Sequence, residues 1–86
     1  MSVTKYFMIQ ELRHIDMEGA ILHFKDGTRG LIEASQQPIT SKWVEGDKVK
    51  FTVAETPIFQ LRCLDTNEIA HALVYDGDEP LSELPN

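Results

Sequence analysis

One stretch decides the fold of this chain: Trp43-Val44-Glu45-Gly46-Asp47-Lys48-Val49-Lys50-Phe51. The glycine at the third position of the turn can adopt a positive φ, which residues with a Cβ rarely do. After the turn, apolar and polar side chains alternate, with Val49, Phe51 and Val53 on one side and Lys48, Lys50 and Thr52 on the other. Successive side chains of a strand point to opposite faces. The stretch therefore predicts a tight turn that leads into a half-buried strand over residues 47–54.

Short segments with the same alternation recur along the chain, separated by glycine, proline and turn-forming polar residues. They predict further strands at residues 21–25, 29–34, 58–64 and 68–75. The first segment, residues 5–15, fits a strand through Phe7 and Ile9 and a helix through Met8, Leu12 and Ile15. We favour the strand. Five or six short strands without a long helix predict an all-β fold, a small antiparallel barrel that resembles the SH3-like and OB-like barrels at the level of fold only.

The connections between these strands carry recognisable turn chemistry. The pair Asp26-Gly27 predicts a two-residue type I′ hairpin, and Gly30 just after it predicts a bulge or a strong bend. Residues 65–68 contain Asp and Asn, whose side chains favour turns through local hydrogen bonds, so they predict a hairpin between the last two strands. Residues 35–42 are polar and contain proline, which predicts a loop with one short helical turn near residues 36–42.

Length and charge set the domain organisation. The chain has 86 residues, enough for one domain that buries roughly 60 to 65% of its unfolded surface. The net charge is −6, and residues 65–86 hold six acids without Lys or Arg. We place a single β-barrel domain at residues 1–75 and an acidic, flexible C-terminal tail at residues 76–86, because the tail has too few apolar side chains to offset the entropy of ordering it.

Composition also bears on compartment and partners. Cys63 is the single cysteine, so an intramolecular disulfide cannot form and a reducing cytoplasm is the expected compartment. The longest apolar run, residues 6–9, is far shorter than the roughly 20 residues that span a bilayer, so we expect no membrane association. The acidic total disfavours nucleic acid as a partner, because non-specific affinity for nucleic acid depends on Lys and Arg.

The polar residues do not form a recognisable catalytic or metal-binding motif. His14, His23, His71 and Cys63 lack the spacing of zinc ligands, so we predict neither a metal site nor a cofactor. Cys63 alternates with core positions and is interpreted as a small buried side chain. The acids fall mainly in turns, where solvent keeps carboxyl pKa values near normal. We therefore predict that the protein has no catalytic residues and is not an enzyme.

Four residues form the predicted binding site: Trp43, Lys48, Lys50 and Arg29. An aromatic ring beside basic residues on one barrel face is the arrangement that holds single-stranded nucleic acid. The competing interpretation is structural, with Trp43 as a cap of the core and the lysines on a solvent-facing strand. The acidic total favours the structural interpretation.

These observations predict a non-catalytic protein-interaction module, acting as an accessory subunit, adaptor or inhibitor of another macromolecule. The alternative is an OB-like or SH3-like protein that binds single-stranded nucleic acid. The expected partner is a protein of unknown identity, contacted through an exposed sheet edge or through the loop of residues 35–43. Homodimerisation is compatible with so small a core.

Overall fold

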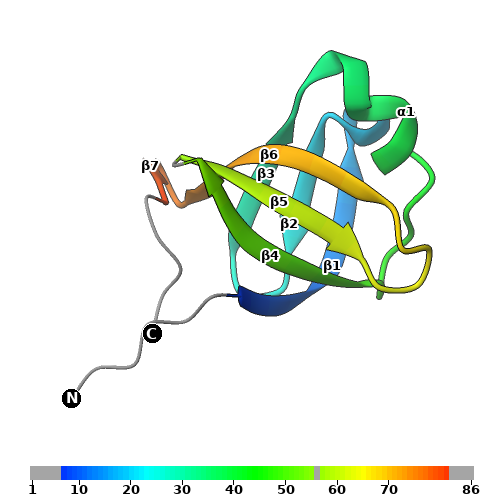
Figure 1. Ribbon diagram of the computed structural model, residues 1–86, viewed down its shortest axis with the longest axis horizontal. Helices are drawn as coiled ribbons and strands as arrows, with labels where there is room; N and C mark the ends of the chain where they lie inside the picture. Colours follow the sequence, from blue (N-terminus) through cyan, green and yellow to red (C-terminus); the bar gives the residue numbers. More distant parts are fainter. Residues whose placement is uncertain (1–6, 56, 82–86) are drawn as a thin grey trace.

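A computed structural model describes residues 7–55 and 57–81. The chain is mostly strand (Figure 1), with bounds β1 (Phe7–Asp16), β2 (Ile21–Phe24), β3 (Thr28–Ile32), β4 (Lys48–Glu55), β5 (Ile58–Cys63), β6 (Ile69–Asp76) and β7 (Glu79–Pro80). In the described part of the chain they are accompanied by η1 (Met17–Gly19), a turn whose three residues all have positive φ, by the 3-10 turn η2 (Ala34–Gln36) and by the helix α1 (Gln37–Thr40). The all-β prediction is confirmed, as are the strand in the first segment and the short helical turn.

Six strands close into an antiparallel barrel. Their order is β3-β2-β1-β4-β5-β6, and β3 also pairs with β6 to complete the ring. β4 lies beside β1, which gives the spatial order 4-1-2-3 of a Greek key. The connection from β3 to β4 carries η2 and α1, and α1 covers one end of the barrel (Figure 1). Each barrel strand is therefore paired on both sides.

The core consists of the inward-facing side chains of all six strands. Phe24 and Phe51 meet edge to face at its centre, with ring centroids 4.7 Å apart. On β4, Val49 and Phe51 are fully buried, as the alternation predicts. Val53, predicted on the same inner side, is exposed. Val53 is still in register with the buried Phe59, but it lies past Thr52, the last β4 residue that pairs with the described part of β1, so β1 does not cover it.

The glycines confirm part of the predicted turn chemistry. Gly46 has φ +95°, as expected for the turn before β4. Gly27 also has φ +95°, but Asp26 is not among the residues of positive φ, so the predicted type I′ turn is wrong. The N–H of Gly27 donates to the carbonyl of Phe24 at 3.0 Å, which fits a longer loop ending in a left-handed glycine. Gly30 pairs in regular register with both neighbouring strands, so the predicted bulge is absent there.

The predicted tail begins with ordered backbone. Residues 79–80 form β7, which pairs with β6 through Tyr75 with Pro80 and Asp76 with Glu79. Leu81 then packs against the edge of the core. The predicted flexibility of residues 82–86 concerns residues outside the described part of the chain. Within the described part, none of the helices is long and apolar enough to cross a membrane.

Candidate functional site

The four residues of the predicted binding site do not come together. Trp43 is only 2% exposed and belongs to the core, so its ring is not available for stacking on a base. Arg29 lies on β3, across the barrel from β4, and its guanidinium donates to the carbonyl of Gly77 at 2.7 Å. Lys48 and Lys50 do share the outer face of β4. The basic residues therefore do not form one surface around an aromatic ring.

The two β4 lysines are also engaged by neighbours on β1. The ammonium of Lys48 lies 2.6 Å from Oε1 of Glu11, and Lys25 binds the other oxygen of that carboxylate. These two lysines lower the pKa of Glu11 to about 2. The ammonium of Lys50 lies 4.5 Å from the ring centroid of Phe7. Lys48 and Lys25 thus share one carboxylate, which cancels one of their two positive charges.

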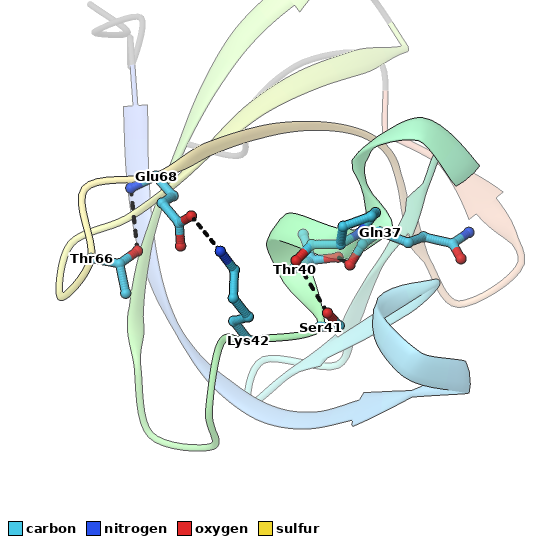
Figure 2. Close-up of polar contacts among 7 residues, drawn as sticks. Gln37, Thr40, Ser41, Lys42, Thr66 and Glu68 are labelled. Carbon is cyan, nitrogen blue, oxygen red and sulfur yellow. Dashed lines mark hydrogen bonds and ion pairs between the residues drawn. The ribbon is translucent and has the colours of Figure 1, made fainter.

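Trp43 belongs to the capped end of the barrel, by which we mean η1, α1, the loop of residues 41–47 and the turn of residues 64–68. Thr40 is fully buried there, and its hydroxyl donates to the carbonyl of Gly19 at 2.7 Å. A Cβ on Gly19 would lie 2.7 Å from the backbone nitrogen of Ser41, so η1 and α1 touch through a glycine. Figure 2 shows the Lys42–Glu68 ion pair, 3.4 Å long, that joins the loop to the turn. This packing supports the structural interpretation of Trp43.

A pair of carboxylates lies at the same end and was missed by the sequence analysis. Oδ2 of Asp47 accepts from the N–H of Val44 at 3.0 Å and from the thiol of Cys63 at 3.3 Å. Burial raises the pKa of Asp47, but these hydrogen bonds and one from Asp65 outweigh it and lower the pKa. The hydrogen bond to Asp47 is the main reason that the pKa of Asp65 is raised. The prediction that turn carboxyls titrate near normal values is wrong for this pair.

The hydrogen bond between the two carboxyl groups couples them, and it moves their pKa values apart, with that of Asp65 raised and that of Asp47 lowered. Ligand atoms of Asp47, Cys63 and Asp65 lie within 4.8 Å of one another, a spacing that a divalent metal could bridge. Asp47 and Cys63 are nevertheless already hydrogen-bonded to each other and, through Val44, to the turn before β4. These hydrogen bonds of Asp47 stabilise the turn before β4. Because Asp47 and Asp65 lie in different turns, the sequence does not indicate that their carboxyl groups meet.

An apolar groove crosses the outer wall of the barrel over β3, β6 and β5. Leu31 pairs with Leu73, and Leu73 pairs with Ile58, so three aliphatic side chains form a continuous row across the strands. Leu31 is 36% exposed and Ile58 is 38% exposed. The remaining lining residues are Ile32, Glu33, His71 and Ala72, and the volume is about 450 Å³. We call this feature the β6 groove.

The rim of the β6 groove is held in place by side-chain hydrogen bonds from the segment after β3. Oε1 of Gln36 accepts from the backbone N–H of His71, which ties η2 to β6. Nε2 of Gln37 donates to the carbonyl of Ile32 at 3.2 Å. The groove is therefore a fixed concave surface with an apolar floor and a polar rim. Its residues were predicted on three separate strands, and only the closure of β3 onto β6 brings them together.

Comparison with known proteins does not assign the chain to a family: no family model matches it, and no curated protein or solved structure is significantly similar to it.

Proposed function

We propose that this protein is a non-catalytic protein-interaction module that binds its partner through the β6 groove. The observation that carries the proposal is the row of Leu31, Leu73 and Ile58, whose apolar surface is left in water on a fixed wall. A concave apolar floor with a few polar groups at its rim is the usual composition of a binding site. We propose that the protein acts in the cytoplasm as an accessory subunit, adaptor or inhibitor.

We propose that the partner binds to the wall of the barrel and does not add a strand to a sheet edge. A closed barrel leaves no unpaired edge among its six strands, which argues against addition of a partner strand there. Insertion of an apolar side chain into the β6 groove requires no free edge. The loop of residues 35–43 contributes Gln36, which accepts from the backbone N–H of His71, a residue that lines the groove.

Acidic residues near the groove indicate what kind of partner would fit it. Glu33 lines the groove, Glu55 pairs with Ile58 at one side, and Asp76 ends β6. The whole chain carries a net charge of −6. We propose that the partner presents an aliphatic or aromatic side chain flanked by Lys or Arg, because complementary charge at the rim speeds association and disfavours acidic competitors.

The test compares groove variants with a matched variant on the opposite wall. Leu31→Glu and Ile58→Glu place a charge in the groove, whereas Ile9→Glu changes a residue that is 46% exposed on β1, across the barrel from β6. A protein captured from native lysate by the immobilised wild-type chain is purified and its affinity for each variant is measured by calorimetry. We expect the groove variants to weaken binding at least about tenfold and Ile9→Glu to change it less than about twofold. Equal binding by all variants would refute the groove as the site.

The alternative function is binding of single-stranded nucleic acid, in which the buried ring of Trp43 could not stack on a base. A titration of the wild-type chain with a single-stranded oligonucleotide at low salt tests it directly. We expect no binding. Binding that weakens steeply with salt, and that Lys48→Ala and Lys50→Ala reduce, would support the alternative over the groove.

A further inference from the structure

Two histidines lie side by side on the outer face of β1 and β2. His14 and His23 are register partners, and their ring centroids are 5.7 Å apart. The pairing of β1 with β2 is irregular between Leu12 and His14, immediately before the pair. Irregularities of this kind redirect side chains and are common beside functional sites. The two histidines lack zinc-ligand spacing in the sequence because they come from different strands.

Two carboxylates face the histidine pair. Oδ2 of Asp16 lies 4.0 Å from Nε2 of His23, while Oδ1 of Asp16 accepts from the N–H of Met17 at 2.9 Å. The hydrogen bond from Met17 holds the Asp16 carboxylate with its other oxygen toward the imidazole. Oε1 of Glu45 lies 3.5 Å from Nδ1 of His14. A carboxylate on Nδ1 orients the His14 ring, makes its other nitrogen more basic and leaves Nε2 of His14 as the ligand atom.

We propose that His14, His23 and Asp16 form a binding site for a divalent transition metal such as Zn²⁺, with Glu45 as a positioning residue for His14. Two imidazoles, one carboxylate and a water molecule make up a tetrahedral set that zinc accepts. Ligand bonds of about 2.1 Å at tetrahedral angles place ligand atoms about 3.4 Å apart. The 4.0 Å between Nε2 of His23 and Oδ2 of Asp16 is near this spacing, and the exposed imidazole of His14 lies beside them, with its ring centroid 5.7 Å from that of His23.

The local charges favour a cation in this groove. The histidines share a surface groove of about 340 Å³ with Asp16 and Arg13. Asp16 and Glu45 contribute two negative charges against the single positive charge of Arg13, and both imidazoles are neutral when they ligate a metal. A divalent cation therefore compensates the carboxylates. The proposal uses residues on the β1–β2 face, so it stands or falls independently of the β6 groove.

Calorimetric titration of the full chain with Zn²⁺ tests the site. We expect one equivalent to bind, His14→Ala and His23→Ala to weaken binding at least about a hundredfold, and Glu45→Gln to weaken it about 10–100-fold. His71→Ala, which removes an exposed histidine of the β6 groove, and Asp65→Asn, which removes one ligand of the Asp47–Cys63–Asp65 cluster, should leave the affinity unchanged. No binding by the wild type, or loss of binding in Asp65→Asn instead of the histidine variants, would overturn the proposal.

A spectroscopic readout identifies the ligands directly. Cu²⁺ suits imidazole ligands and binds nitrogen sites more tightly than the other divalent first-row metals. The electron paramagnetic resonance spectrum of the Cu²⁺-loaded chain should show coupling to two imidazole nitrogens. Either histidine variant should reduce this to one, with unchanged far-ultraviolet circular dichroism. Coupling to two nitrogens that survives both single substitutions would contradict the assignment.

Discussion

The capped end and the β6 groove lie on one small barrel, yet they differ in how much of their side chains is exposed to solvent. At the capped end, Thr40 is fully buried and hydrogen-bonded to Gly19, whose neighbouring backbone leaves no room for a Cβ. In the groove, Leu31 and Ile58 keep more than a third of their surface in water. The capped end thus buries Thr40 and Trp43, although Nε1 of Trp43 has no hydrogen-bond partner among the described residues, whereas the groove keeps aliphatic side chains in contact with water.

The largest loss should come from filling the contact at Gly19. Gly19→Ala places a Cβ 2.7 Å from a backbone nitrogen and forces φ +98° on a residue that avoids it. We expect the free energy of unfolding in urea to fall by about 2–5 kcal/mol. Gly46→Ala is the matched control, because its φ is +95° but open space surrounds the added Cβ, so about 1–2 kcal/mol is expected. Equal losses in the two variants would mean that the close packing of η1 on α1 does not contribute to the free energy of unfolding.

The next effect concerns the buried hydroxyl of Thr40. Thr40→Val keeps the shape but leaves the carbonyl of Gly19 without its 2.7 Å donor. We expect a loss of about 1–3 kcal/mol in the free energy of unfolding, the cost of a buried polar group without a partner. Thr52→Val, on the outer face of β4, makes the same chemical change where solvent is near and should stay within about 0.5 kcal/mol. A smaller loss at Thr40 than at Thr52 would contradict this view of the capped end.

The two carboxylates of the capped end should stabilise the fold in different ranges of pH, with a smaller effect on the free energy of unfolding than the substitutions above. Asp65 has a raised pKa, because it hydrogen-bonds to Asp47, so its contribution to stability is complete below 3.8 and is lost as pH rises through the raised value. Asp47 has a lowered pKa: burial opposes ionisation, but hydrogen bonds from Val44, Asp65 and Cys63 prevail. Its contribution is present above 3.8 and is lost as pH falls through the lowered value.

Urea unfolding of Asp65→Asn from about pH 3 to about pH 7 measures the first of these contributions. We expect the variant to gain stability relative to the wild type as pH rises above 3.8, because the wild type then ionises a second carboxylate beside Asp47. Asp78→Asn, in the exposed turn before β7, is the control for the loss of one carboxylate away from Asp47. Parallel curves for Asp65→Asn and the wild type would show that the two carboxyls are not coupled.

The smallest effect on stability should be in the groove itself. Leu31→Thr retains a strand-forming residue at an outward position and should change the free energy of unfolding by only about 0.5 kcal/mol, while it weakens partner binding. Thermal denaturation with and without the purified partner separates the two effects. A large loss of stability in the free chain would place Leu31 among the core residues and would remove the contrast between the two regions.

Much of the fold was predictable because it depends on local patterns. Alternation located Val49 and Phe51 in the core, and the conformational freedom of glycine located the turn at Gly46. The errors at Val53 and Asp26 arose where the extent of strand pairing or the length of a loop, which are set between strands, overrode the local pattern. The predicted site failed for a similar reason. A tryptophan beside lysines in sequence says nothing about which side of a closed barrel each one faces.

The sequence by itself determined that this chain forms strands, where most of them begin and end, and which of their side chains face inward, since these properties depend on residues two positions apart. Only the tertiary structure decided that β3 closes onto β6, that Asp47 meets Asp65, and that His14 stands beside His23. The physical reason is the same in each case. Contacts between residues distant in sequence depend on strand order and register, which are set by packing of the whole core and leave no mark on any one segment.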